Sequence, residues 1–375
     1  MLMVAERSPS PQPPTVAEVY RFVVGVDTHA KVHQYAIVEA ATGRVLDEGG
    51  FPTSAAGLAR AAAWIARRTG GDLDPGPGSV LVSCEGTGSY GARLAKLLLE
   101  VGYRVVDAPS PKRDRGQDKD DTIDAIKAAR GVLGTRVDRL AEVRAGQLQE
   151  ALKVLLAARD RMAGESTRSV NALTALLRGV DLGLDARRKL TATQIRQVAR
   201  WRTRSESPAA AIARAEAVRL AARIMQLRVE LAANKTQLRQ IVQAHAPVLL
   251  DTYGVGPVNA AIVLSVWSHP GRVHHEAALA KLGGVSPIKL ESGDSTEHRL
   301  NRGGDRQLNR ALHSIAKTRM ERDPHTQAYV ERRTRQGLSK RRIRRCLKRY
   351  IARQLFRTLT THTEQINNQV TPSAA

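Results

Sequence analysis

Two aspartates, three residues apart, are well spaced for metal chemistry. Asp121 and Asp124 begin a stretch whose apolar residues recur at helical spacing, so both carboxylates are expected on one face of a helix's first turn. Like charges this close repel, and the pair costs stability unless a cation lies between the carboxylates. Taken alone, the pair is explained as well by an acidic helix N-terminus, which the helix dipole favours.

Two further acids upstream change that balance. Asp27 ends an apolar run over residues 22–27, and Glu85 ends a second run over residues 79–85. Each run predicts a buried strand. Singly, Asp27 could be a turn residue and Glu85 a surface acid. Four carboxylates at one point would be unstable without divalent metal, whereas two Mg²⁺ ions there would form the clamp used for in-line displacement at phosphorus.

The elements around these acids predict an α/β domain over residues 21–137. Strands are expected at 22–27, 32–38, 44–51, 79–85 and 103–106, and helices at 54–65, at 90–101 and from 119 onward. The first three strands should form an antiparallel meander, and the element order is that of the ribonuclease-H-like fold. Its first and fourth strands are neighbours, which would place Asp27 beside Glu85, with the helical aspartate pair approaching from the last helix.

The segments on either side of this domain differ from it in composition. Residues 1–20 are rich in proline and serine and predict a disordered tail. Residues 138–246 predict a helical linker, with helices at 139–178 and 193–201 and a heptad repeat from Ala210 to His245. Asn234 falls within this heptad seam, where a polar residue typically sets register and partner number. The seam fits a hairpin within one chain or a coiled coil between chains, and both hold if two hairpins dimerise.

A mostly α-helical C-terminal domain is expected over residues 247–360, followed by a tail over 361–375. The domain opens on a glycine hairpin before an apolar helix, like the start of a helix-hairpin-helix element. Gly254 and Gly256 in this hairpin could present backbone N–H groups to phosphate oxygens without reading sequence. An ordinary helix–helix turn is the alternative interpretation.

Charge favours nucleic acid as the partner. The 375 residues contain 59 Lys and Arg against 36 Asp and Glu, a net charge of +23. Residues 299–357 hold 19 of those bases and 4 acids, a surplus of 15 positive charges, which predicts phosphate contacts that weaken steeply with salt. Arg302, Arg306 and Arg310 are spaced by four and are expected on one helical face as phosphate contacts.

Other classes of partner and compartment are disfavoured. Aromatic residues make up only 3% of the chain, so base-stacking platforms should not dominate. No apolar run is long enough to span a bilayer, and no secretory signal opens the chain. The two cysteines, Cys84 and Cys346, support neither a disulfide framework nor a zinc site. A cytoplasmic, nucleoid-associated protein is the expectation.

These motifs together resemble a known family, the bacterial insertion-sequence transposases and recombinases of the bridge-RNA-guided group. That group has a four-acid (DEDD) RuvC-like domain and a catalytic-serine C-terminal domain. Asp120 stands where the family's third motif has threonine. The matching motifs are 25–27 (Gly-Val-Asp), 85–90 (Glu-Gly-Thr-Gly-Ser-Tyr), 119–125 (Lys-Asp-Asp-Thr-Ile-Asp-Ala), 254–257 (Gly-Val-Gly-Pro), and 292–293 (Ser-Gly) followed by 302–310.

The resemblance implies a mechanism. Ser292 would attack a DNA phosphodiester and form a covalent phosphoserine link, and Ser295 is close enough to compete for that role. A non-coding guide RNA would pair with donor and target DNA. The active site would combine acids and serine from different protomers of a homodimer or tetramer. The metal would be Mg²⁺, held by the four acids Asp27, Glu85, Asp121 and Asp124.

Two alternatives remain open from the residues. The first is a Mg²⁺-dependent RuvC-like junction nuclease that uses no covalent serine intermediate. The second is a non-catalytic nucleic-acid-binding scaffold that uses only the basic C-terminal region, an interpretation that leaves the four acids unexplained.

Overall fold

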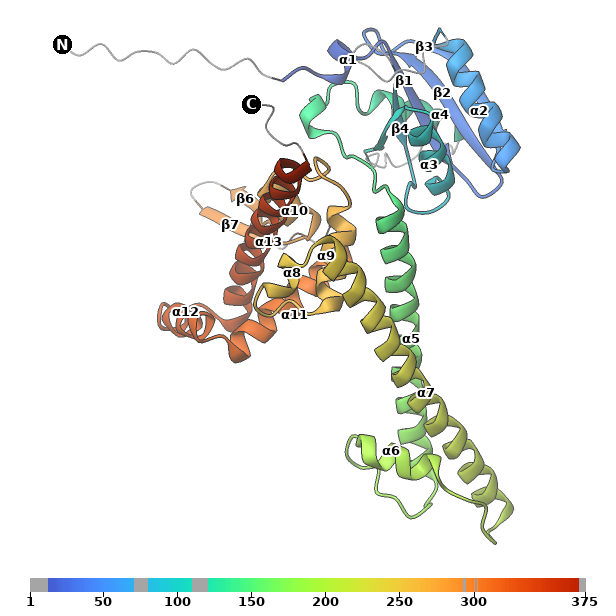
Figure 1. Cartoon of the computed structure of the whole chain (residues 1–375), viewed down its shortest axis with the longest axis vertical. Helices are drawn as coiled ribbons and strands as arrows, with labels where there is room; N and C mark the ends of the chain where they lie inside the picture. The colour runs from blue at the N-terminus through green and yellow to red at the C-terminus, as the bar shows by residue number, and fades with distance from the viewer. Residues whose placement is uncertain are drawn as a thin grey trace, which may run out of the picture. The chain divides into compact units, whose positions relative to one another are not determined.

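The computed structural model describes residues 13–70, 80–109, 121–292, 295–299, 301 and 303–370, with the side chains of 121, 289–300 and 368–370 outside that description. The chain divides into two compact units, residues 1–145 and 146–375. Each is described by itself (Figure 1).

The first unit is built on a five-stranded mixed sheet. Strands β1 (Phe22–Thr28), β2 (Val32–Glu39) and β3 (Val45–Pro52) form the expected antiparallel meander. Strands β4 (Val80–Cys84) and β5 (Arg104–Asp107) add to β1 in parallel, giving the order β3-β2-β1-β4-β5. The predicted adjacency of the first and fourth strands is thereby confirmed.

Helices cover both faces of this sheet, because apolar side chains alternate along its strands. Helices α2 (Ala55–Arg68) and α3 (Ala92–Glu100) pack on the face that carries Val24 and Val26. Helix α4 (Asp121–Arg130) packs on the opposite face, which carries Val23. Residues 86–91 form turns, so α3 begins later than the expected residue 90.

The expected N-terminal tail is wrong over residues 13–20. A short helix, α1 (Val16–Val19), buries Val16 and is followed by buried Tyr20 on the α4 side of the sheet. Backbone hydrogen bonds hold the segment, from Val16 N to Thr135 O at 2.9 Å and from Val137 N to Pro14 O at 2.9 Å. Burial of these apolar side chains offsets the conformational entropy that the segment loses when it becomes ordered. Residues 1–12 lie outside the described part.

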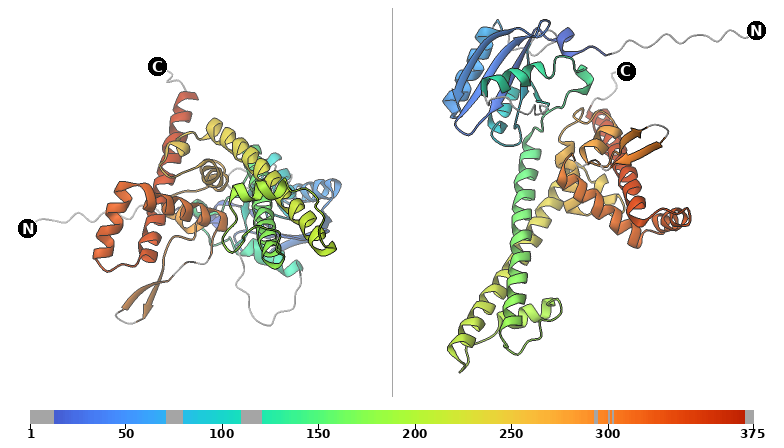
Figure 2. Two further views of the ribbon diagram at one scale, coloured as in Figure 1. Left: turned by 90° about the horizontal axis from the view of Figure 1, so that it is seen from below. Right: turned by 180° about the vertical axis from the view of Figure 1, so that it is seen from behind.

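The second unit begins with a long helix pair, α5 (Gln147–Gly179) and α7 (Pro208–His245), with α6 (Ala192–Ala199) packed beside α7 (Figure 2). The expected helix over 139–178 starts late: residues 137–139 form only a 3₁₀ turn (Val137–Arg139), and Gly146, at φ +95°, precedes α5.

The heptad seam of α7 packs within the chain. Leu227 and Leu238 are fully buried, and α7 packs extensively on α5. Asn234, 5% exposed, donates from Nδ2 to Leu155 O at 3.0 Å, and Arg159 donates to its Oδ1 at 3.3 Å. The hairpin within one chain is therefore confirmed, whereas association of two such hairpins stays a prediction.

The rest of the second unit is mostly helical. Its elements are α8 (Val248–Asp251), α9 (Pro257–Trp267), α10 (Glu276–Leu282), the hairpin β6 (Ile288–Ser292) and β7 (Ser295–Arg299), α11 (Arg306–Arg322), α12 (Pro324–Arg335) and α13 (Lys340–Val370). Buried α9 lies at the centre of a core that also takes Leu152 from α5 and Val242 from α7. The expected linker and C-terminal domain thus share one core.

Two further expectations for this region are corrected. The tail expected from residue 361 is helical to Val370, because Leu355 and Leu359 anchor α13 in the core; residues 371–375 lie outside the described part. Within the C-terminal domain expected to be mostly α-helical, residues 288–292 and 295–299 instead form the β6–β7 hairpin, stabilised by pairing between strands rather than by apolar patterning. No helix in the described part of the chain is long and apolar enough to cross a bilayer.

Candidate active site

Asp27 and Glu85 lie side by side at the carboxyl ends of β1 and β4. The two strands are parallel with Val26 opposite Cys84, and Glu85 N donates to Val26 O at 3.0 Å. Asp27 is only 7% exposed. The Thr28 hydroxyl donates to Glu85 O at 3.2 Å and ties the two strand ends together. Each acid directly follows an apolar run, which is why both emerge at the same edge of the sheet.

Helix α4 is brought to this edge by a close approach to β1. A Cβ on Gly25 would lie 1.9 Å from Ala125 O and 2.5 Å from Ala129 N, so only glycine permits this contact. The buried Ser83 hydroxyl donates to Ala128 O at 2.7 Å, which attaches the helix to β4 as well. The helix that carries the aspartate pair is therefore fixed against both strands that carry the other acids.

The electrostatics of Glu85 link this acid to two of the other three. Burial raises the pKa of the Glu85 carboxyl, and the negative charges of Asp27 and then Asp124 raise it further, opposed by His29. His29 Nδ1 lies 3.4 Å from Asp27 Oδ2. Asp124 pairs with Lys127 at 3.2 Å. The fourth acid, Asp121, is the first residue of α4, and its side chain lies outside the description.

The donor set suits a hard divalent cation. Carboxylate oxygens are the ligands that Mg²⁺ prefers, and like charges facing a partly buried Glu85 would be neutralised by such an ion. Among the side chains that the structure describes, no three acids, histidines or cysteines are already closed around one point. Asp27, Glu85 and Asp124 thus fit a metal by the chemistry of their carboxylate oxygens, although the described side chains do not form a closed metal site.

A further acid lies at the same edge, one residue beyond the strand expected at 103–106, and was not among the predicted site residues. Asp107 ends β5 directly opposite Cys84 and accepts a hydrogen bond from the Thr87 hydroxyl. Burial, followed by the charges of Asp107, Glu85 and Asp27, raises the pKa of the Cys84 thiol. Asp107 directly follows an apolar run, and this is the same sequence signal that identified Asp27.

In the second unit, the two candidate nucleophiles face each other. Ser292 ends β6, Ser295 begins β7, and the two residues are register partners in this antiparallel pair. Their side chains lie outside the description, so the choice between them stays open. Both serines come from the tip of one hairpin.

The glycine turn at 252–256 joins α8 to α9. Gly254 has φ +78°, and a Cβ there would approach Arg319 Cγ at 3.2 Å. Arg319 Nε donates to Tyr253 O at 2.8 Å. Gly256 is the N-cap of α9. The turn is therefore braced against α11, as an ordinary helix–helix turn would be, while a phosphate-binding role for its N–H groups stays a prediction.

Of the three arginines expected on one helical face, Arg306 and Arg310 lie on α11. Helix α11 begins at Arg306, after the N-cap Asp305, because the Asp305 side chain accepts from Leu308 N at 2.8 Å and ends the non-helical segment. Arg302 lies outside the described residues. Arg306 and Arg310 are exposed one turn apart, and Arg310 forms an ion pair with Asp160 of α5.

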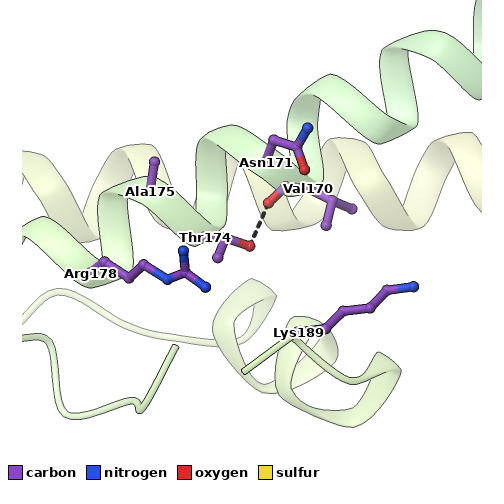
Figure 3. Close-up of a pocket in the computed structure, with 6 residues that line it drawn as sticks. All are labelled: Val170, Asn171, Thr174, Ala175, Arg178 and Lys189. Carbon is purple, nitrogen blue, oxygen red and sulfur yellow. Dashed lines mark hydrogen bonds between the residues drawn. The ribbon is translucent and has the colours of Figure 1, made fainter. Parts of the chain in front are cut away.

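One cavity of about 420 Å³ lies elsewhere in the second unit, on the α5 side of the helix pair (Figure 3). Its lining holds two cations and no acid, and Arg178 already donates from Nε to Ala186 O at 2.8 Å. The cavity therefore lacks carboxylates of the kind found at the sheet edge. Its lining residues are Val170, Asn171, Thr174, Ala175, Arg178 and Lys189.

Comparison with known proteins finds matches to two transposase families. Residues 24–181 match a DEDD-type IS110 family described as a transposase, and residues 246–331 match the transposase IS116/IS110/IS902 family. Over 107 residues the chain is 35% identical to an uncharacterised 43.6 kDa protein of insertion element IS110 from Streptomyces coelicolor. That match covers 28% of this chain and 26% of the relative, so the chain spans about a quarter of that relative's length.

Proposed function

We propose that this protein is the DNA transposase, or recombinase, of an insertion sequence and that it works by phosphoryl transfer. The proposal is carried by the adjacency of Asp27 and Glu85 at one sheet edge, with the charge of Asp124 also acting on Glu85. These acids lie in the part of the chain that matches the DEDD transposase family, and the serine hairpin lies in the part that matches the second transposase family. DNA is the proposed substrate.

Metal dependence follows from the acids. Asp27, Glu85 and Asp124, together with Asp121, would hold divalent cations, and Mg²⁺ suits an all-oxygen site next to phosphate. Such ions polarise phosphoryl oxygens and offset the charge that develops on the attacking and leaving oxygens. The protein's part is positional: Gly25 and Ser83 hold α4 against the strands, and His29 beside Asp27 balances some of the negative charge.

The covalent step is assigned to Ser292, with Ser295 as the alternative. The serine Oγ would form a bond to phosphorus while the bond from phosphorus to a deoxyribose oxygen breaks. The hydroxyl loses its proton as the new bond forms, and the leaving oxygen takes up a proton. The product is a protein–DNA phosphodiester, which conserves the energy of the broken bond and allows strands to be exchanged and resealed.

Two partners complete the proposal, and both rest on the family resemblance. A non-coding RNA carried by the element would guide donor and target DNA by base pairing, consistent with the low aromatic content and the strongly basic C-terminal part. A homo-oligomer, dimer or tetramer, would combine acids from one protomer with the serine of another. Association with the nucleoid would follow from the DNA substrate.

A search for a covalent adduct tests the proposal. The protein is purified with its co-expressed flanking non-coding RNA, supplied with Mg²⁺ and matching DNA, and analysed on denaturing gels. The expected result is a protein–DNA adduct that disappears in Ser292→Ala and in Asp124→Asn and persists in Ser295→Ala. Persistence in Ser292→Ala with loss in Ser295→Ala would transfer the role to Ser295.

The other outcomes identify the alternative functions. DNA cleavage without any adduct would refute the serine mechanism and favour a metal-dependent junction nuclease. DNA binding with neither cleavage nor adduct would favour a non-catalytic scaffold.

A further inference from the structure

The packing between α11 and α13 leaves a row of polar and basic side chains along one side of the interface. Asn309, His313 and Lys317 follow each other at four-residue spacing on α11, and Arg344 and Lys348 do the same on α13. The buried face of the same helix pair is apolar and includes Leu312 and Ile343. The cations therefore lie on the flank of a well-packed helix interface.

Hydrogen bonds place this row at the base of the serine hairpin. Lys348 Nζ donates to Asn309 Oδ1 at 2.7 Å, and Asn309 Nδ2 donates to Gly283 O at 2.6 Å. A Cβ on Gly284 would lie 2.6 Å from Gly303 O, so the chain entering the hairpin and the chain leaving it pass in close contact. Lys348 is thus connected through Asn309 to the backbone just before β6.

Within the described part of the chain, no carboxylate contributes to the pKa shifts of Lys348 and His313 in this row. Burial lowers the pKa of the half-buried Lys348 ammonium, and the neighbouring Arg344 and Arg345 lower it further. Burial also lowers the pKa of the His313 ring, as do Arg344, Lys348 and Lys317. For both groups, every charge that shifts the pKa within the described part of the chain is a cation.

A buried hydrogen-bond donor of Arg344 also favours an external anion at this row. Arg344 Nε is buried and has no hydrogen-bond partner among the residues that the structure describes. Buried polar groups are normally satisfied, and clustered cations normally meet carboxylates. Lys317 does so, with Glu321 at 3.8 Å. Arg344 and Lys348 are left for an external anion.

We propose that Arg344 and Lys348, flanked by His313, form a site for a backbone phosphate of duplex DNA at the base of the Ser292 hairpin. This inference rests on the proposed function, in which DNA must approach that hairpin. Duplex DNA supplies closely spaced phosphates that can satisfy both cations, and contact with the backbone would hold the substrate without reading its sequence. The site would bind DNA before the covalent step and would take no part in that step.

Salt dependence of binding tests this site. A short duplex DNA of arbitrary sequence is titrated with the full-length protein in EDTA at several salt concentrations. Arg344→Gln/Lys348→Gln should weaken binding equally on different sequences and should reduce the slope of log K against log salt by about one per lost phosphate contact. Lys235→Gln/Arg239→Gln removes the same charge at the same spacing from exposed positions on α7 and should leave the slope unchanged.

Three outcomes would overturn the assignment. The slope could stay unchanged in the α13 variant, it could fall as much in the α7 control, or it could fall only when a single-stranded RNA probe replaces the duplex. If the double variant loses its helical circular dichroism, the single variant Arg344→Gln is measured instead. It should reduce the slope of log K against log salt by about half as much. Adduct formation by the wild type in Mg²⁺ is measured separately, so failure of this site leaves the transposase proposal standing.

Discussion

Asp160 of α5 holds Arg310 of α11, with Arg310 Nη2 lying 2.8 Å and 2.9 Å from the two carboxylate oxygens. The same carboxylate accepts from Gln307 Nε2 at 3.0 Å. A residue of the helix pair therefore neutralises an arginine that the sequence suggested as a phosphate contact. Substrate binding through Arg310 must compete with this intramolecular ion pair.

Asp160→Asn should strengthen binding of duplex DNA. The ion pair is exposed, so its loss should change stability by no more than about 1 kcal/mol, and the released arginine should raise affinity by up to about fivefold. Fluorescence anisotropy at low salt measures the effect. Glu165→Gln is the matched control, because it removes an acid from the same helix whose partner is Arg223 of α7. Equal gains in both variants would show a general charge effect.

Gly25→Ala should displace α4 and impair the acid cluster. The new methyl group would overlap Ala125 O, and overpacking of this kind costs about 1–3 kcal/mol. Activity should fall further than stability, since a shift of about 1 Å in a catalytic group can cost about 100-fold. Thermal melts and adduct yield are compared with Gly134→Ala, where an added Cβ meets nothing within 4 Å. Normal adduct yield would contradict the positioning role of Gly25.

Glu85→Gln should stabilise the metal-free protein while abolishing adduct formation. The pKa of Glu85 is raised above its ordinary value of 4.5 in the folded state, so the folded protein binds its proton more tightly than the unfolded chain. Its contribution to stability is therefore present at pH values below 4.5 and is lost as the pH rises through the raised folded pKa. Glutamine should remove that pH dependence.

Magnesium gives the second measurement on the same variant. An ion present at about a hundredfold its Kd should stabilise the wild type by about 2.7 kcal/mol, and the variant by less. Melting curves with and without Mg²⁺, across the acidic to neutral range, follow both effects. Equal Mg²⁺ stabilisation of the two proteins would exclude Glu85 as a ligand.

Leu227→Ala should destabilise the helix pair without changing the oligomeric state. Leu227 is fully buried within one chain, and truncation of a buried leucine costs about 2–5 kcal/mol. Circular dichroism melts measure the loss, and light scattering measures the mass. Val229→Ala on the same helix, at a side chain 70% exposed, should change stability by less than about 0.5 kcal/mol. If the leucine variant alone dissociates an oligomer, the heptad seam also holds two chains together.

Local patterns by themselves determined much of the first unit. Apolar runs that end in Asp27 and Glu85 predict strands with acids at their ends, and helical spacing from Asp121 predicts the start of α4. These signals are short-range, because strand and helix periodicities depend on neighbouring residues. The same rule, applied one strand further, would have found Asp107.

The tertiary structure decided which partners these elements meet. The heptad spacing of α7 shows an apolar stripe, and only packing shows that α5 of the same chain covers it. The pairing of Ser292 with Ser295 and the burial of Val16 likewise depend on contacts that composition does not encode. Asp160 and Arg310 are separated by 150 residues, and no local signal links them. The pattern of apolar and polar side chains can be read from the sequence. Which charges pair, which glycines allow close contacts and which helix faces meet depend on the packing of the folded chain.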